Sequence, residues 1–175
     1  MTKVNERIIK KALGKDKKHP ELHKVGYQDG YWYATNGYVL VRMENQPQLL
    51  PLFSDNEVRQ PNYKFMMNNA AKNKYREIFI PYSVDEIKAW KTHIESQGKR
   101  MAFKLGEKIN SCGMEIYIGV NPDFLIWAME TTKSNEIKIP YDSKAMIMEG
   151  NNLTWLIMPI HLPDYYLNPE TMTEI

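Results

Sequence analysis

The chain has 175 residues, enough for one domain or two small ones, and 43% of them are hydrophobic and 25% charged. The formal net charge of +2 is too small to predict nucleic-acid binding unless the basic residues cluster, and no apolar run is long enough to predict a membrane span. The single cysteine excludes an intrachain disulfide and, with the polar first residues, favours a cytoplasmic protein.

A basic amphipathic helix is predicted near the start of the chain. We expect a short strand over residues 1–4, a helix over about 6–13 capped by Asn5, and a left-handed end at Gly14. The polar side of this helix is cationic, and the candidate DNA-binding residues are Lys3, Arg7, Lys10, Lys11 and Lys15. Such a face is typical either of phosphate contacts, which do not depend on base sequence, or of a solvated lysine surface.

An aromatic hairpin follows the helix. Strands are predicted over about 22–28 and 31–43, and Asp29-Gly30 between them favours a tight turn. The aromatic side chains here either stabilise the sheet by cross-strand pairing, which is the commoner role, or stack on single-stranded bases.

Residues 45–75 are interpreted as an irregular insertion with one short helix near 64–72. Three prolines and several asparagines in this segment break regular structure and favour turns.

A second helix is predicted from a capping box. A strand over 78–81 leads to Ser83, whose side chain and that of Glu86 can cap each other's backbone, and Gly98 ends the helix after Gln97. Further strands are predicted over 101–105, 114–119, 136–140, 144–148 and 153–158.

A third helix begins at Asn121, with Pro122 in its first position. It is apolar nearly all round, so we expect it to be mostly buried, and Asp123 and Glu130 are its charged residues. The alternation of helices with antiparallel strands predicts an α+β fold.

Several segments resemble the bacterial sliding clamps, the beta subunit of DNA polymerase III. Tyr33-Ala-Thr-Asn-Gly-Tyr-Val-Leu40 resembles the family's Ala-Thr-Asp-Gly-His-Arg-Leu segment. The region from Asn121 to Leu162 resembles the closing half-domain, in which an Asn-Pro-opened helix leads into strands and a last hydrophobic strand runs into Met-Pro. The first helix and the junction at Ile78–Pro81 are similar to the openings of clamp units.

The resemblance implies a DNA-clamp-like fold of repeated helix-plus-antiparallel-sheet units, with the helices inside a ring. We expect a single clamp-like domain over 1–162, with three helical units, or about one and a half clamp domains, the insertion 45–75 and a tail at 163–175. A full clamp subunit has three domains, so this chain resembles an abbreviated or divergent relative. Closing a ring would require a homo-oligomer.

The resemblance also implies a non-enzymatic protein of DNA replication or repair. It would bind duplex DNA without sequence specificity, clamp-binding peptides of replication or repair proteins, or both, and would need no cofactor. The matching peptide-groove positions are Thr35, Gly37, Tyr38, Leu40, Ile157, Met158, Pro159 and Ile160. Small and apolar side chains suit a pocket for an apolar peptide anchor. The alternative for Leu40, Ile157 and Ile160 is that they simply pack in the core of the sheet. Tyr38 and Val39 replace the family's His and Arg.

Two alternatives stay open. The acidic third helix favours a clamp-fold interaction module, of mobile-element or phage type, that does not encircle DNA. An unrelated enzyme would need a dispersed site, for example at the aromatic hairpin with Asp142 or Glu149. His19 and His23 are too few to predict a metal site, and Cys112 has no nearby histidine to activate it.

Overall fold

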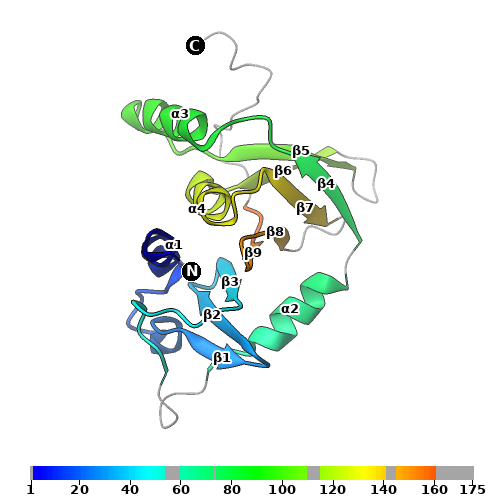
Figure 1. Ribbon diagram of the computed structural model, residues 1–175. Coiled ribbons are helices and arrows are strands. Elements are labelled where there is room, and N and C mark those ends of the chain that lie inside the picture. Colours follow the sequence, from blue (N-terminus) through cyan, green and yellow to red (C-terminus); the bar gives the residue numbers. More distant parts are fainter. Residues whose placement is uncertain (1, 54–59, 73, 110–114, 141–144, 161–175) are drawn as a thin grey trace.

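The computed structural model describes residues 2–53, 60–72, 74–109, 115–140 and 145–160, which form four α-helices and two antiparallel sheets (Figure 1). The predicted α+β class is therefore confirmed. The helices are α1 (Lys3–Ile9), α2 (Tyr63–Ala71), α3 (Val84–Ser96) and α4 (Pro122–Thr132), with 3-10 turns η1 (Lys10–Ala12) and η2 (Pro20–Leu22). The strands are β1 (Gly26–Gln28), β2 (Tyr31–Thr35), β3 (Val39–Met43), β4 (Tyr75–Phe79), β5 (Phe103–Ile109), β6 (Glu115–Val120), β7 (Glu136–Pro140), β8 (Met146–Gly150) and β9 (Leu153–Ile157).

The larger sheet joins the two ends of the described chain. Its strand order is β1-β2-β3-β9-β8-β7-β4, and β5 and β6 form a separate pair. The central ladder is antiparallel and runs from Val39 opposite Ile157 to Met43 opposite Leu153. The first unit, α1 with β1–β3, is thereby fused to the last unit, α4 with β7–β9.

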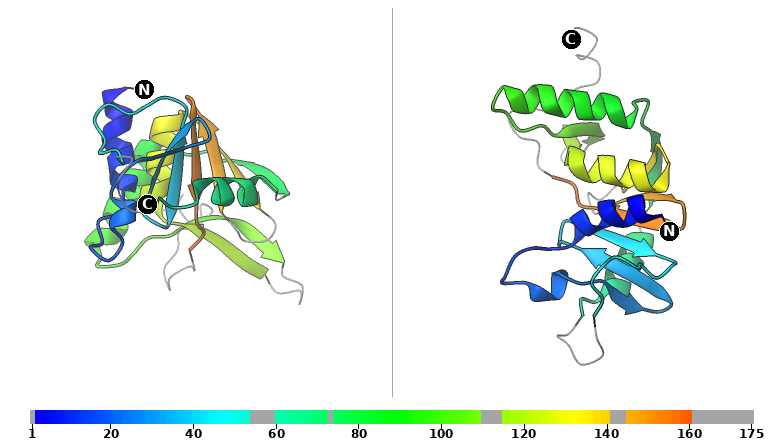
Figure 2. Two further views of the ribbon diagram at one scale, coloured as in Figure 1. Left: turned by 90° about the horizontal axis from the view of Figure 1, so that it is seen from below. Right: turned by 60° about the vertical axis from the view of Figure 1, so that its left-hand side comes forward.

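Helices cover both faces of this sheet, but unequally. Helices α1, α4 and α3 lie side by side on one face, with α4 in the middle, and α2 lies on the opposite face (Figure 2). Each of the four helices is followed by one or more strands, and α2, which lies in the insertion, leads into β4 alone.

Alternate side chains of the central strands serve the two faces. Val41 and Trp155 are fully buried in the core beneath α1 and α4, whereas Leu40 and Leu156 pack toward α2. This follows from the two-residue period of a strand. The apolar runs Val39–Val41 in β3 and Trp155–Ile157 in β9 therefore reflect burial on both faces.

The first helix begins earlier than predicted. Thr2 caps α1, since its Oγ1 accepts a hydrogen bond from the backbone N–H of Asn5 at 3.2 Å, so residues 3 and 4 are helical rather than a strand. Gly14 is not left-handed. It must be small because an added Cβ would lie 2.6 Å from Cβ of Leu22.

The predicted hairpin turn is confirmed. Asp29 and Gly30 have φ angles of 52° and 85°, and Gln28 pairs with Tyr31 across the turn. The strand predicted over 31–43 is instead two strands, because the chain reverses at residues 36–38.

The helix caps predicted for α3 and α4 are also confirmed. Ser83 and Glu86 form the complete capping box, and Gly98 follows the helix with a φ of 73°. Asn121 Oδ1 accepts from the N–H of Asp123 at 2.9 Å, and Pro122 occupies the first turn.

The insertion contains the predicted short helix, α2, and a loop that is fixed to α1. The buried carboxylate of Glu6 accepts hydrogen bonds from the backbone N–H groups of Gln48 and Leu49.

No helix in the described part of the chain is both long and apolar enough to span a bilayer. Cys112, Asp142 and the tail 163–175 lie outside the described residues.

Candidate functional site

The turn between β2 and β3 is built from short polar side chains. Asn36 Oδ1 accepts from the N–H groups of Tyr38 and Val39 at 2.9 and 3.0 Å. Thr35 Oγ1 accepts from the Gly37 N–H and donates to the carbonyl of Val39 at 2.6 Å. Gly37 has a φ of 91°, which favours glycine. These contacts hold the turn in one conformation.

The end of β9 is attached to the same turn. The N–H of Met158 donates to the carbonyl of Tyr38 at 2.9 Å, one residue beyond the β3–β9 ladder. The two sequence segments that resemble the clamp groove, far apart in the chain, therefore lie side by side.

Helix α2 forms a third wall opposite these strands. It is anchored by Tyr63, whose buried ring stacks on Tyr33 of β2, and by the hydroxyl of Tyr75, which donates to the carbonyl of Ala70. Asn62 caps the helix by accepting from the N–H of Phe65 at 3.0 Å. The anchoring leaves a gap between the helix and the turn.

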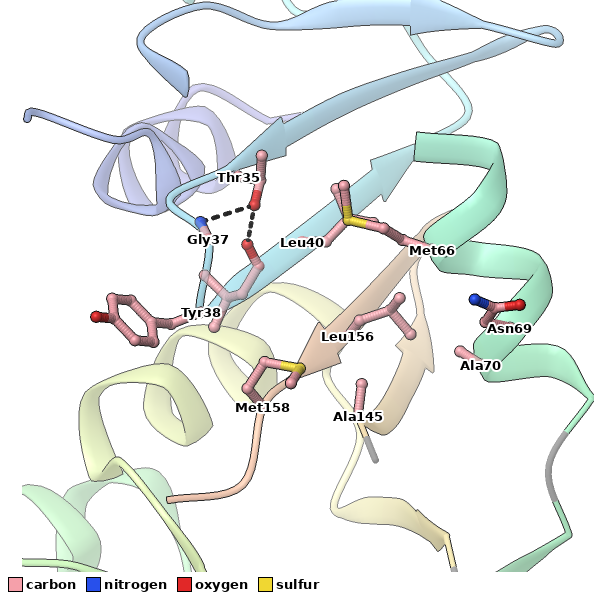
Figure 3. Close-up of a pocket in the computed structure, with 11 residues that line it drawn as sticks. Thr35, Gly37, Tyr38, Leu40, Met66, Asn69, Ala70, Ala145, Leu156 and Met158 are labelled. Carbon is pink, nitrogen blue, oxygen red and sulfur yellow. Dashed lines mark hydrogen bonds between the residues drawn. The ribbon is translucent and has the colours of Figure 1, made fainter. Parts of the chain in front are cut away.

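A cavity of about 340 Å³ fills that gap (Figure 3). Its walls are mostly apolar, and Met66 and Met158 stand at its rim with 37% and 44% of their surfaces exposed. The lining residues are Thr35, Gly37, Tyr38, Val39, Leu40, Met66, Asn69, Ala70, Ala145, Leu156 and Met158. An open, apolar cavity with flexible methionines suits an apolar side chain of a partner.

The structure brings five of the eight predicted groove residues to this cavity: Thr35, Gly37, Tyr38, Leu40 and Met158. Ile157 instead points into the core beneath the helices, and Pro159 and Ile160 do not line the cavity. Leu156 could have been found from the sequence, because it lies two residues before Met158 and so on the same strand face. The contributions of α2 could not, since they depend on how the insertion folds back.

The predicted DNA-binding residues lie together on α1 and the segment after it. Lys3, Arg7, Lys10, Lys11 and Lys15 are all exposed, and no described carboxylate forms an ion pair with any of them. Lys11 Nζ lies 5.9 Å from the centre of the Trp127 ring on α4. Lys11, in η1, therefore reaches from the segment after α1 to α4.

The acidic residues of α4 are paired with lysines of α3. Glu130 contacts Lys88, and Asp123 lies 3.4 Å from Lys91. The negative charge that the sequence placed on this helix is thus offset by its neighbour. The two acidic residues of α4 therefore add little net negative charge to the face formed by α1, α4 and α3.

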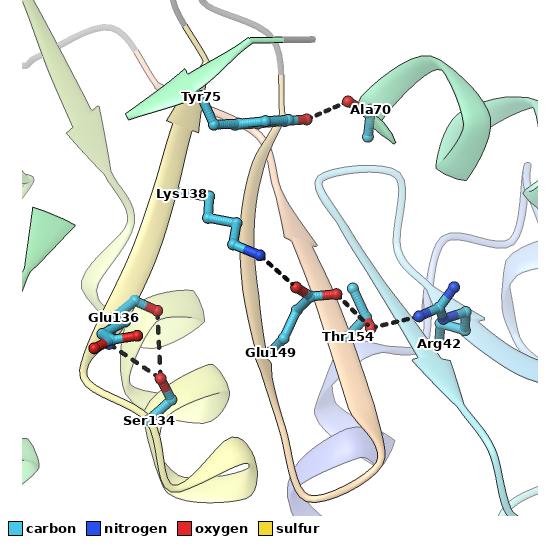
Figure 4. Close-up of polar contacts among 8 residues, drawn as sticks. All are labelled: Arg42, Ala70, Tyr75, Ser134, Glu136, Lys138, Glu149 and Thr154. Atoms are coloured by element: carbon cyan, nitrogen blue, oxygen red, sulfur yellow. Dashed lines mark hydrogen bonds and ion pairs between the residues drawn. The ribbon is translucent and has the colours of Figure 1, made fainter. Parts of the chain in front are cut away.

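A polar network crosses the sheet face that also carries α2 (Figure 4). Arg42 donates to Thr154 Oγ1 at 3.0 Å, and Glu149 accepts from Lys138 Nζ at 2.8 Å. The Lys138 pairing raises the pKa of this lysine, mainly through the hydrogen bond to Glu149. These groups satisfy one another, as in a structural ion-pair network.

The two histidines near the start of the chain make other contacts. Among the described residues, no group of three or more His, Cys, Asp or Glu side chains is placed to hold a metal. His19 instead contacts Glu21 at 3.0 Å, and His23 Nε2 lies 2.7 Å from the carbonyl of Asp16.

Comparison with known proteins yields no family model and no curated protein that matches this sequence, but solved structures of similar fold exist. The DNA polymerase III subunit beta of Borrelia burgdorferi, in complex with a natural product, is 14% identical with a TM-score of 0.57, over 91% of this chain and 61% of that chain. The Helicobacter pylori beta clamp bound to a DNA ligase peptide is 12% identical with a TM-score of 0.59, over 90% and 62%. The Bartonella birtlesii sliding clamp bound to griselimycin is 12% identical with a TM-score of 0.57, over 91% and 64%.

These similarities show the sliding-clamp fold at low sequence identity. The chain spans a little over three fifths of the length of each of these subunits. It is a divergent chain with that fold.

Proposed function

We propose that this chain is a non-enzymatic clamp-fold protein whose cavity between β3, β9 and α2 binds an apolar anchor of a partner peptide. The observation that carries the proposal is the convergence of the Thr35–Leu40 turn, the end of β9 and α2 on one mostly apolar cavity. One neighbour of the same fold was solved with a DNA ligase peptide. Binding would need no bond chemistry from the cavity, whose described side chains include no carboxylate, histidine or lysine.

A labelled peptide tests this proposal. The probe is a fluorescein-labelled ten-residue peptide with a central Leu-Phe pair, titrated with protein and followed by fluorescence anisotropy. Met158→Glu and Met66→Glu each place a charge at the cavity rim and should weaken binding by about tenfold or more. Phe65→Glu is the matched control, because Phe65 is exposed on the same helix but does not line the cavity. Equal losses in all three variants would contradict the proposal.

A second function, binding of duplex DNA without sequence specificity, is favoured by the cationic face of α1. The exposed cations there lack carboxylate partners in the described chain, and the acids of α4 are paired with α3. On this proposal the helices face the duplex, and a closed ring would require several copies of the chain. Arg7→Glu/Lys11→Glu should weaken binding to a 30-base-pair duplex at about 50 mM salt by about tenfold or more. The matched control is Lys72→Glu/Lys74→Glu, which makes the same charge change elsewhere.

The two functions separate experimentally. Peptide binding without salt-dependent DNA binding would favour an interaction module that does not encircle DNA. Light scattering after size-exclusion chromatography reports self-association, and a strict monomer at high concentration would contradict ring closure while leaving peptide binding intact.

A further inference from the structure

A second cavity adjoins the apolar one at the β2–β3 turn. It has a volume of about 750 Å³ and lies between that turn and the segment after α1. Gly37 and Tyr38 line both cavities. A chain that leaves the apolar cavity across this turn therefore enters the second one directly.

The shared turn leaves a passage. Tyr38 is 64% exposed, and its ring projects away from Leu156 and Met158 (Figure 3). A Cβ built on Gly37 would meet nothing within 4 Å, so the space beside this residue is open. The backbone on either side is held by Asn36 and Met158, so the passage has fixed walls.

The second cavity is cationic. Lys11 and Lys15 line it together with His19, and Asp16 is the one carboxylate among its lining residues. The Asp16 side chain is occupied in part, since its Oδ1 accepts from the Lys18 N–H at 2.9 Å. A third cavity of about 310 Å³ shares Lys11 and Lys15 and adds Arg7 and Lys10. Positive charge therefore dominates next to the apolar site.

Resting on the proposed function, we propose that the preferred partner peptide carries an acidic residue next to its apolar anchor. The anchor enters the cavity between β3, β9 and α2, the peptide crosses Gly37, and the carboxylate lies near Lys11 and Lys15. Exposed ion pairs of this kind add modest affinity but suppress partners of the wrong charge. The cationic second cavity would thus select among apolar peptides by their charge.

Paired peptides test the selection. Two versions of the Leu-Phe probe carry Glu three residues before or three residues after the anchor, and each has a Gln counterpart. At about 50 mM salt one Glu peptide should bind about twofold to fivefold more tightly than its counterpart, and the difference should vanish at about 500 mM salt. Lys11→Gln/Lys15→Gln should abolish the difference while leaving the affinity for the Gln peptide unchanged.

Lys17→Gln/Lys18→Gln is the matched control. It removes the same amount of positive charge from two exposed lysines that line neither cavity. If both variants lose the Glu preference equally, the effect is one of overall charge and the inference is wrong. Equal affinity of the Glu and Gln peptides for the unmodified protein overturns this inference but not the proposed function. Lys11 and Lys15 would then be candidates for DNA binding only. Failure of all four peptides to bind overturns the proposed function and this inference with it.

Discussion

The ring of Tyr63 lies flat on that of Tyr33, with ring centres 4.9 Å and planes 5° apart. This stack joins β2 to α2, the helix that forms one wall of the apolar cavity. The Tyr63 hydroxyl is buried and has no hydrogen-bond partner among the described residues. A buried hydroxyl without a partner lowers stability.

Tyr63→Phe should therefore keep the stack and raise the free energy of unfolding, by up to about 1 kcal/mol. Urea denaturation followed by circular dichroism at pH 7 measures the change. Peptide affinity should stay the same, because the hydroxyl does not reach the cavity. A loss of more than about 1 kcal/mol would mean that the hydroxyl has a partner.

Burial also predicts alkaline destabilisation. Desolvation raises the pKa of Tyr63 and, to a smaller extent, that of Tyr33, so both keep their protons at pH values where the unfolded chain loses them. The contribution of these tyrosines to stability is therefore constant below about pH 10 and falls as the pH rises above it. The fall is about 1.4 kcal/mol per pH unit for Tyr63 and smaller for Tyr33. Denaturation at pH 9, 10 and 11 should show this fall, and Tyr63→Phe should reduce its slope. An unchanged slope in the variant would contradict the assignment.

Gly26 pairs with Tyr33 in the sheet and lies against the hydroxyl end of the Tyr63 ring. A Cβ at this position would lie 2.5 Å from Tyr63 Cε2, so Gly26→Ala should displace α2 and cost about 1–3 kcal/mol. The labelled Leu-Phe peptide should also bind less tightly, because α2 is a wall of the cavity. In a double-mutant cycle the cost should shrink when Tyr63 is replaced by Ala as well, and strict additivity would exclude the clash as its cause.

Trp155 ties the last strand to α4 on the opposite face of the sheet. Its Nε1–H donates to Thr131 Oγ1 at 2.8 Å, and both residues are fully buried. Thr131→Val keeps the shape but leaves the indole N–H unpaired, and it should cost about 1–3 kcal/mol. Thr92→Val is the control: its hydroxyl also donates to a helix carbonyl but is exposed, so we expect a change within about 0.5 kcal/mol.

Local signals explain what the sequence predicted well. The Ser83 capping box, the Asn121-Pro122 opening and the Asp29-Gly30 turn each depend on a few adjacent residues, and all three are confirmed. The start of α1 was misplaced because Thr2 and Asn5 both have side chains that cap helices, and local sequence does not choose between them.

Long-range contacts explain what the sequence did not predict. The role of α2 as a cavity wall depends on Tyr63 reaching Tyr33 across the insertion. The pairing of Glu130 and Asp123 with lysines of α3 depends on how two helices pack. Apolar residues such as Ile157 and Leu156 differ only in the strand face they occupy, which is set by the register with β3.

The ladder between β3 and β9 has a consequence for biosynthesis. Arg42 and Thr154, paired in this ladder, are 112 residues apart, so the nascent N-terminal unit emerges long before the strand that completes it. At about 5–20 residues per second, β3 waits roughly 6–20 s with an open edge after leaving the ribosome. An open strand edge of this kind can pair with strands of other chains. The yield of soluble protein in cells should therefore depend on the supply of chaperones, even if the folded protein is stable.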